Sequence, residues 1–428
     1  MAGKRLDAKA GKYLAGCDLS GALYRKPPIF ARGRNAELWD VKGRRYLDFC
    51  AGFASVSLGH GNRELAREAA RLASTLAETH SQRNEAQILL AERLAKSVGR
   101  GMKTFIDVGG SAGVESCLKF AHAKTGKRGV LCFEGGFHGR SIGLLGLSRG
   151  SALKAFSGIA SGPRAFHTPY SYCYRCPFGK KYPGCGIECA AAAARMLEAN
   201  KKEIGIVLAE PAQGSGGYVF PPKEFFAILR EACDRSGALL AMDEIQMGVA
   251  RTGRMYCFEH YGVKPDLVVL GKGMCGGLYP LNAVIGREDI MDAAPRGSMY
   301  SAFTGNPLGC GLALKVLGII ERDSICERSS VNGAHLVKRL LEIRGRNSAI
   351  GDVEGKGLAV GVELVRGGKE PAKLETRQMI ERGLKAGLLL KDGGILRNRL
   401  VLSPPLTIGR KEIGEFCQRF EGVLEECF

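Results

Sequence analysis

Short apolar runs alternate with glycine-rich turns and with longer stretches of helical periodicity through the middle of the chain. A continuous apolar run of about four to eight residues is typical of a strand that is buried on both faces of a parallel sheet. The pattern predicts strands at residues 103–107, 129–133, 204–209, 239–242 and 267–270. Helices are predicted between and around them, at residues 62–98, 114–123, 222–236 and 308–322. This alternation favours an α/β fold with a mostly parallel central sheet.

The two ends of the chain differ from the middle. Residues 1–36 are predicted to form an irregular arm, and residues 37–61 alternate around the turn Asp40-Val41-Lys42-Gly43, which is typical of a hairpin. Residues 281–285 are predicted as the last strand of the sheet, antiparallel or at its edge. We expect three parts: an amino-terminal arm with part of a small domain (1–60), a large domain (61–322) and a carboxy-terminal small α+β domain (323–428).

The composition is that of a globular protein. The chain has 428 residues, of which 45% are hydrophobic and 25% charged, so it has enough apolar material for a large core. No apolar run approaches the roughly 20 residues of a membrane helix, and the amino terminus lacks a secretory signal pattern. Fifteen scattered cysteines in such a chain favour free thiols in a reducing compartment. We expect a cytoplasmic protein without a membrane partner.

The formal net charge of +19 raises the question of nucleic-acid binding. The lysines and arginines are spread along the chain, however, without a basic arm, a basic tract or interleaved aromatic residues. A nucleic-acid interface normally has one of these patterns. The charge therefore predicts a solvated surface with affinity for small anions, and no nucleic-acid partner.

An acid and a lysine follow two of the predicted strands. Asp243 closes the 239–242 run and Lys272 closely follows the 267–270 run, so we expect both side chains at the carboxyl edge of the sheet, where open α/β sheets bind ligands. Each residue alone is more simply explained as part of a buried ion pair. A desolvated lysine facing a cleft is also what imine chemistry requires, and in enzymes that use pyridoxal 5′-phosphate (PLP) a carboxylate pairs with the ring nitrogen.

Two glycine-rich loops after other strands add candidate binding groups. Residues 109–113, GGSAG, precede a predicted helix, and the free N–H groups at a helix start bind phosphate. Such a turn is common and is a weak signal by itself. In the loop 134–140, Phe137 is an aromatic residue that can stack on a flat ring, and Arg140 can clamp a carboxylate.

Four cysteines lie close together in CYRCPFGKKYPGCGIEC. Their spacing is compatible with a zinc or iron–sulfur site, because four thiolates in a short loop can close a tetrahedron, and it is equally compatible with free thiols. We keep both alternatives for Cys173, Cys176, Cys185 and Cys189.

In order along nearly the whole chain, these motifs resemble the class III aminotransferases, the PLP enzymes of fold type I that include the 4-aminobutyrate and ornithine aminotransferases. The resemblance rests on LWDVKGRRYLDFCAGFASVSLGH, the glycine turn at 109–111, FHGR, EPAQGSGG, DEIQMGVARTG, the Lys272 loop and SPPLTI. It implies a large domain with a mostly parallel sheet, a smaller α+β domain, PLP as the cofactor and a homodimer whose site is built across the interface.

The resemblance also implies roles for individual residues. Lys272 matches the lysine that binds the cofactor and then shuttles protons, and Asp243 matches the partner of the ring nitrogen. Gln246 matches the residue that contacts the phenolic oxygen of the ring.

The remaining cofactor contacts are implied in the same way. Phe137 matches the aromatic stacked on the ring, and His138 belongs to the same motif. Gly110 and Ser111 match the phosphate-binding amides. The threonine that reaches the phosphate from the partner subunit aligns with Ala302, so we expect Ser301 or Thr304 to replace it.

On the substrate side, Arg140 matches the family's carboxylate-binding arginine, and Glu210 matches the glutamate that gates a second arginine. That second arginine aligns with Val401; Arg399 lies on the same strand face about 7 Å away and is a candidate replacement. The alternative is a smaller acceptor such as pyruvate. Phe53 stands where smaller aliphatic residues often line the pocket.

The implied reaction is ping-pong transfer of an amino group from an ω-amino acid, with 4-aminobutyrate as the first candidate, to a 2-oxo acid such as 2-oxoglutarate. Three alternatives remain: a PLP-dependent amino-acid racemase or epimerase, a pyruvate-using ω-transaminase, and a cofactor-binding protein without activity. Lys272, Asp243, Gln246, Arg140 and Glu210 together argue against the last.

Overall fold

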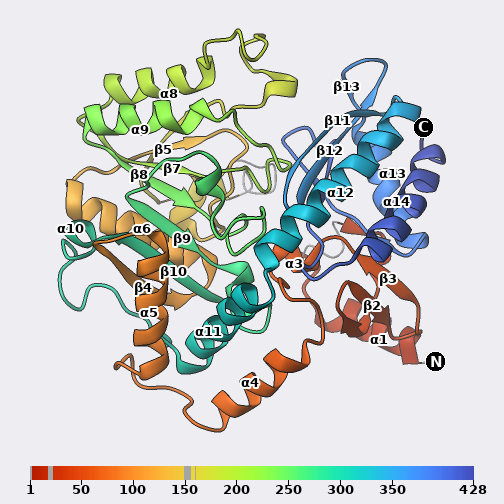
Figure 1. Cartoon of the computed structure of the whole chain (residues 1–428), viewed down its shortest axis with the longest axis horizontal. Helices are drawn as coiled ribbons and strands as arrows, with labels where there is room; N and C mark the ends of the chain where they lie inside the picture. Colours follow the sequence, from red (N-terminus) through yellow and green to blue (C-terminus); the bar gives the residue numbers. More distant parts are fainter. Residues whose placement is uncertain (1, 18–22, 149–155, 160) are drawn as a thin grey trace.

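The computed structural model describes residues 2–17, 23–148, 156–159 and 161–428. Its centre is a seven-stranded sheet with the order β4-β10-β9-β8-β7-β5-β6 (Figure 1). The strands are β4 (Met102–Val108), β5 (Gly129–Phe133), β6 (Arg164–Thr168), β7 (Ile204–Ala209), β8 (Leu239–Asp243), β9 (Leu267–Leu270) and β10 (Leu281–Arg287). All five strands predicted from apolar runs are present, and the α/β class is confirmed.

The strands of the central sheet are parallel except for one. The neighbours β6, β5, β7, β8 and β9 run parallel, whereas β10 is antiparallel to both β9 and β4. The strand expected at residues 281–285 is therefore antiparallel, but it lies inside the sheet and not at its edge. The two edges are formed by β4 and by β6, and the sequence of β6, RAFHT, has no apolar run and was not predicted.

Helices cover both faces of this sheet. Alternate side chains of each central strand point to opposite faces, and Ile206 and Leu208 of β7 pack on the same side as α6 (Gly110–Thr125) and α10 (Glu288–Met291). The other face packs against α5 (Glu85–Val98), α8 (Glu188–Ala199), α9 (Glu224–Ser236) and α11 (Pro307–Arg322). Both faces are buried, which explains the continuous apolar runs.

A second body is formed by the carboxy-terminal part (Figure 1). Its sheet has the order β11-β12-β16-β15, with β13 paired to β12. The elements are α12 (Ile325–Arg346), β11 (Ile350–Lys356), β12 (Ala359–Arg366), β13 (Glu370–Pro371), α13 (Lys373–Lys385), β15 (Asp392–Gly393), β16 (Arg399–Leu402) and α14 (Arg410–Glu425).

The amino-terminal strands join this second body. A further sheet has the order β1-β2-β3-β14, from β1 (Phe30–Arg34), β2 (Glu37–Asp40), β3 (Arg45–Asp48) and β14 (Leu388–Leu389). The predicted hairpin is present, and the Asp40 carboxylate accepts the N–H groups of Lys42 and Arg44 at 2.8 and 3.0 Å. The short helix α3 (Ala51–Ala54) follows and leads towards the central sheet.

Two expectations for the amino-terminal third are corrected. Helix α1 (Ala2–Tyr13) replaces part of the irregular arm, in a segment rich in strong helix formers. The helix expected at 62–98 is interrupted, giving α4 (Arg63–Ala73) and α5. The interruption ends at Asn84, whose side chain accepts the N–H of Gln87 at 3.0 Å and donates to the carbonyl of Gly305 at 2.8 Å, so it starts a new helix.

Across the described ranges, the helices include none with the length and apolar character needed to traverse a lipid bilayer.

Candidate active site

A cavity lies where the parallel strands of the central sheet end. It has a volume of about 510 Å³. Of the residues predicted from the sequence, it is lined by Gly110, Ser111, Phe137, His138, Arg140, Glu210, Asp243, Gln246 and Lys272. The structure therefore brings together groups that are distributed over more than 160 positions of sequence, at the edge where α/β sheets bind ligands.

Lys272 enters the cavity from the turn after β9. Its φ of +36° lies in the left-handed region, a conformation that costs free energy for a residue with a side chain and is found most often at functional sites. Its Nζ donates a hydrogen bond to Oε1 of Gln246 at 2.8 Å. Burial lowers the pKa of Lys272 to about 8, against the opposing charges of Asp243 and Glu210. The amine is thus close to its neutral, nucleophilic form near physiological pH.

Asp243 is the last residue of β8 and forms a buried pair with His138. The imidazole Nδ1 donates to Oδ2 of Asp243 at 2.8 Å, and the two residues are 3% and 4% exposed. Burial alone would lower the pKa of His138, but the hydrogen bond and the charge of Asp243 outweigh it and raise this pKa above its usual value. The hydrogen bond therefore fixes the orientation of the Asp243 carboxylate at the cavity wall.

The start of α6 forms a cup of backbone N–H groups. Helix α6 begins at Gly110, four residues earlier than expected, because Gly109 takes a φ of +84° and turns the chain into the helix. The N–H groups of the first turn have no partner within the helix. The loop after β5 closes over this cup, since the N–H of Arg140 donates to Oγ of Ser111 at 3.3 Å.

These groups fit PLP, the cofactor implied by the resemblance. A buried amine of lowered pKa is available to an aldehyde, a buried carboxylate is available to a ring nitrogen, and a helix start is available to a phosphate. The volume is also in the range of about 300–1,000 Å³ that small-molecule sites have. Lys272, Asp243, Gln246, Phe137, His138, Gly110 and Ser111 would hold the cofactor.

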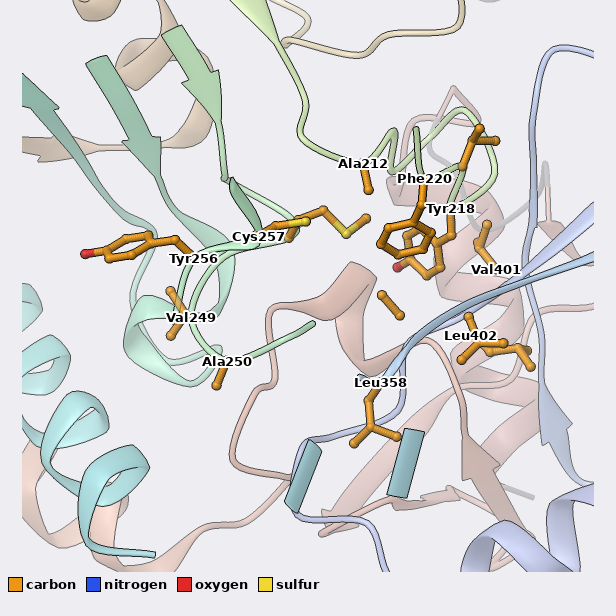
Figure 2. Close-up of a cluster of buried hydrophobic side chains, with 14 of the residues drawn as sticks. Ala212, Tyr218, Phe220, Val249, Ala250, Tyr256, Cys257, Leu358, Val401 and Leu402 are labelled. Atoms are coloured by element: carbon orange, nitrogen blue, oxygen red, sulfur yellow. The ribbon is translucent and has the colours of Figure 1, made fainter. Parts of the chain in front are cut away.

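Tyr218 is a site residue that was missed in the sequence. Its hydroxyl accepts a hydrogen bond from Nε2 of Gln246 at 3.0 Å, and this places the amide oxygen of Gln246 towards Lys272. The ring is fully buried in the apolar cluster that also contains Phe220 and Val401 (Figure 2). The signal was present, because Tyr218 directly follows the glycine-rich EPAQGSGG stretch.

Glu210 follows β7 and is held by backbone groups. Its two carboxylate oxygens accept the N–H groups of Phe137 at 2.9 Å and of Gly214 at 2.8 Å. Burial raises the pKa of Glu210 to about 7. Within the described part of the chain, no arginine forms an ion pair with Glu210. The resemblance implied that Glu210 gates a second arginine, but Arg399, the candidate for that role, is paired with Glu363 instead.

Arg399 is not placed at the cavity, which corrects its assignment as a substrate residue. Its guanidinium is fully buried between the two bodies of the protein, and Nη1 lies 3.3 Å from Glu363 and 3.5 Å from Asp352. Its Nε donates to the carbonyl of Gly217 at 2.8 Å. The acids of β11 and β12 bind this cation, because a buried charge without a partner would be very costly.

Phe53 and Ser301 also lie outside the lining of the cavity. Phe53 is half-buried in α3, two residues before Ser55, which does line the cavity. The hydroxyl of Ser301 donates to Oδ1 of Asp107 at 2.5 Å.

The four clustered cysteines surround a separate, small cavity of about 20 Å³. They are Cys173, Cys176, Cys185 and Cys189, all in the free thiol form. Among the described residues, no group of three or more His, Cys, Asp or Glu side chains is arranged so that it could hold a metal ion. The structure thus does not support the metal-site alternative for this loop.

Comparison with known proteins agrees with this site. The family described as "Aminotransferase class-III" matches residues 24–424. The chain is 33% identical over 410 residues to a leucine/methionine racemase of Thermococcus litoralis, which covers 94% of this chain and 91% of the relative. It is also 33% identical over 413 residues to the 4-aminobutyrate aminotransferase GabT of Escherichia coli, covering 94% and 93%.

A solved structure extends the likeness to three dimensions. The amine transaminase of an uncultivated Pseudomonas species, in its PLP-bound form, superposes with a TM-score of 0.89 at 27% identity, over 97% of this chain and 98% of that one. With a family match over nearly the whole sequence and a cavity that fits the cofactor, the chain belongs to the class III aminotransferases, which use PLP.

Proposed function

We propose that the protein transfers the amino group of an ω-amino acid of the 4-aminobutyrate type to a 2-oxo acid such as 2-oxoglutarate, by a ping-pong mechanism. The observation that carries this proposal is one cavity that contains Lys272, the His138–Asp243 pair and the guanidinium of Arg140. An amine with a lowered pKa performs the proton transfers, and a cation at the wall binds a carboxylate.

PLP, when bound, supplies a ring that delocalises the charge left when a proton leaves the carbon next to the amine. The chain supplies the proton transfers. With a pKa of about 8, Lys272 is neutral in about one molecule in ten at pH 7, and the neutral amine accepts a proton and later returns it. Gln246 holds the lysine through its amide oxygen at 2.8 Å.

Asp243 and His138 act as a fixed electrostatic pair. The carboxylate is positioned before any substrate arrives, because its two oxygens already accept the N–H of His138 and the N–H of Ile245, the latter at 3.2 Å. A carboxylate held in this way needs no reorganisation while the reaction proceeds, which is the main advantage of a preorganised site. When PLP is bound, this carboxylate would stabilise the protonated form of the ring nitrogen.

Arg140 is the group proposed to orient the donor. Its side chain is exposed at the cavity wall, and its guanidinium lies 5.6 Å from the centre of the Phe137 ring. A planar guanidinium binds a carboxylate through two parallel hydrogen bonds. A donor with its amine several bonds away from its carboxylate would then reach Lys272 from Arg140.

The racemase of Thermococcus litoralis supports a second candidate function. A racemase needs the same proton removal and returns the proton to the opposite face of the carbon. The same cavity would serve both reactions, and they differ in whether the amino group leaves with the cofactor.

One assay separates the two. PLP-loaded enzyme is incubated with 4-aminobutyrate and 2-oxoglutarate or pyruvate, and amino-acid formation is measured by chromatography. In parallel, single enantiomers of amino acids are incubated without an oxo acid. We expect amino transfer that requires both substrates, with parallel lines in double-reciprocal plots, and a loss of at least about 10³-fold in Lys272→Ala.

Inversion of an enantiomer without an oxo acid, together with no transfer, would replace the transaminase proposal by the racemase. Transfer that persists in Lys272→Ala would contradict the role given to the lysine.

We also infer a homodimer. Three large apolar side chains are exposed: Leu278, Tyr300 and Phe303 are 53%, 74% and 52% exposed. Leu278 lines the cavity, and Ser301 lies between the other two, outside the cavity of its own chain. An exposed apolar patch beside a site is a common feature of a subunit interface. A second copy that covers this patch would bring its own Ser301 near the cofactor.

A further inference from the structure

Tyr218 has a strained backbone conformation one hydrogen bond away from the cavity. Its φ of +56° lies in the left-handed region, and Gly217 before it has a φ of +112°. A residue with a side chain keeps such a conformation only where the surrounding structure fixes it, and such residues are most frequent at functional sites. The side chain of Tyr218 is fully buried and does not line the cavity. Any role of Tyr218 in the reaction therefore acts through another residue.

The start of β16, in the second body, fixes the backbone of this turn. Arg399 donates from Nε to the carbonyl of Gly217 at 2.8 Å and from Nη2 to the carbonyl of Tyr218 at 3.4 Å. The approach is close, because a Cβ atom on Gly217 would lie 2.7 Å from Cδ of Arg399. A guanidinium presents its N–H groups in a rigid fork and can bind both carbonyls at once. Arg399 thus holds the strained turn in place.

The residue that follows β16 fixes the hydroxyl group of Tyr218. The hydroxyl of Ser403 donates to the carbonyl of Cys50 at 3.2 Å, and Ser403 is also hydrogen-bonded to the side chain of Tyr218. A serine hydroxyl has one proton, so the proton of the second bond comes from Tyr218. Val401 lies between Arg399 and Ser403 on the same strand face, in the apolar cluster that contains the Tyr218 ring (Figure 2).

The bonding of Tyr218 determines which way the amide of Gln246 points. An amide turned by 180° exchanges its oxygen and nitrogen with almost no change in shape. Because the proton of the Tyr218 hydroxyl is bound by Ser403, its oxygen can only accept, and it accepts Nε2 of Gln246 at 3.0 Å. Oε1 of Gln246 is therefore left to accept from Nζ of Lys272 at 2.8 Å.

We propose that Tyr218 is a positioning residue for Lys272, because its hydroxyl keeps the oxygen of the Gln246 amide directed at the lysine. Arg399 and Ser403 of the second body in turn fix Tyr218. The proposal rests on the proton transfer by Lys272 in the proposed function and adds the residues that hold the amine for it. A fixed acceptor needs no rearrangement when the amine gains or loses a proton.

The test measures the proton affinity of Lys272 in the cofactor-free protein. Trace acetylation with acetic anhydride at a series of pH values, followed by peptide mass spectrometry, gives the midpoint at which this amine becomes reactive. We expect Tyr218→Phe to lower the midpoint by about one pH unit, because the ammonium form loses a fixed acceptor. The charged groups that act on Lys272 are Asp243 of β8, Glu210 after β7 and Lys391 after β14, and this substitution changes none of them.

Tyr256→Phe is the matched control. Tyr256 is a buried tyrosine of the same apolar cluster (Figure 2), and its hydroxyl is hydrogen-bonded to Oγ of Ser97 at 2.6 Å. This variant therefore also loses a buried hydrogen bond, but Lys272 should keep the wild-type midpoint. Circular dichroism verifies the fold of both variants.

Two further variants test the second body while Tyr218 stays in place. Ser403→Ala frees the hydroxyl proton of Tyr218 for donation to Gln246, so the amide can turn and the midpoint should fall by about half a pH unit. Arg399→Lys keeps a positive charge beside the acids of β11 and β12 but cannot bind both carbonyls of the turn, and it should shift the midpoint in the same direction.

A double-mutant cycle distinguishes positioning from a purely structural role. In the Gln246→Met protein, Tyr218→Phe should change the midpoint by less than about 0.2 pH unit, because the hydroxyl acts only through the amide. In the PLP-loaded enzyme, Tyr218→Phe should lower kcat by about tenfold with a smaller change in KM, because Tyr218 does not contact the substrate.

An unchanged midpoint or kcat in Tyr218→Phe, or an equal midpoint shift with and without the Gln246 amide, would overturn the positioning role. Wild-type midpoints in both Ser403→Ala and Arg399→Lys would overturn the role of the second body. The labelling requires no activity, so the expected shifts in a protein that transfers no amino group would contradict only the proposed function. A working transaminase whose Lys272 midpoint is independent of Tyr218 would contradict only the positioning role.

Discussion

At Lys272, burial and the neighbouring negative charges shift the pKa of the amine in opposite directions. Burial disfavours the ammonium form, while Asp243 and Glu210 favour it, and the balance is a pKa of about 8. An amine with no such burial would keep a pKa near 10.4 and would be almost entirely protonated at neutral pH. The buried position of Lys272 therefore lowers the pKa of its amine before a cofactor is bound.

The rate at which the cofactor-free protein captures PLP should follow this pKa. Only the neutral amine attacks an aldehyde, so the rate constant should rise with pH through about 8 and then level off. At pH 7 the neutral fraction would be about one in ten, a few hundred times that of an ordinary lysine. Absorbance after rapid mixing measures the rate, and Lys272→Ala gives the background. A midpoint at or above about pH 10 would contradict the lowered pKa.

Side-chain direction at single residues was the least predictable feature. Val401 and Arg399 were correctly expected on one strand face, but the partners of Arg399 come from β11, β12 and the 217–218 segment, which the local pattern does not indicate. The partner of a buried charge is chosen by what the fold places next to it.

At the scale of elements, the phosphate cup depends on contact between the start of α6 and the loop after β5. Gly139 has a φ of +136°, and a Cβ atom there would lie 2.6 Å from Oγ of Ser111 and from Cδ1 of Leu144. The loop can therefore approach the helix only because this residue has no side chain.

Gly139→Ala should weaken PLP binding by about tenfold or more, because the added methyl displaces Ser111 or the loop and no side chain fits this backbone without strain. Titration of the cofactor-free variant with PLP, followed by absorbance, measures the effect. Gly146→Ala is the control, since a Cβ there meets no atom within 4 Å. Equal PLP affinity in both variants would show that the cup does not depend on this contact.

Elements with a strong local signal were predicted well, and those without it were not. The apolar runs of β5, β7, β8 and β9 identified the strands that carry the site. The edge strand β6, with the sequence RAFHT, has polar residues at three of its five positions and pairs with only one neighbour, so its sequence lacks the doubly buried pattern. The break between α4 and α5 depends on the bond from Asn84 to Gly305, which is remote in sequence.

At the scale of the whole molecule, the amino-terminal segment is fixed by the carboxy-terminal one. β3 pairs with β14 in parallel, and the N–H of Ser403 donates to the carbonyl of Phe49 at 2.7 Å. These contacts hold the segment that follows, with Phe53 and Ser55, between the two bodies of the protein. The part of the cavity wall that contains Ser55 is therefore positioned by segments from opposite ends of the chain.

A charge in the exposed apolar patch should separate the proposed dimer. We expect Tyr300→Glu and Phe303→Glu, combined, to raise the dissociation constant of the dimer by at least about 100-fold, because a carboxylate buried in an interface without a partner is costly. Sedimentation velocity measures the mass. Leu374→Glu, at an exposed apolar residue of α13, is the control. A wild type that remains a monomer while binding PLP would refute the dimer.

The sequence by itself determined the α/β class, the strands that end at the cavity and the position of Lys272 and Asp243 at the ends of two of them. These features are encoded locally, because a buried strand needs a run of apolar residues and a polar residue directly after it must emerge at the sheet edge. Only the tertiary structure decided which groups contact the cations of the second body. Arg399 is neutralised by acids of β11 and β12, and Lys391 is left over Phe53, because charges pair according to distance in space and not in sequence.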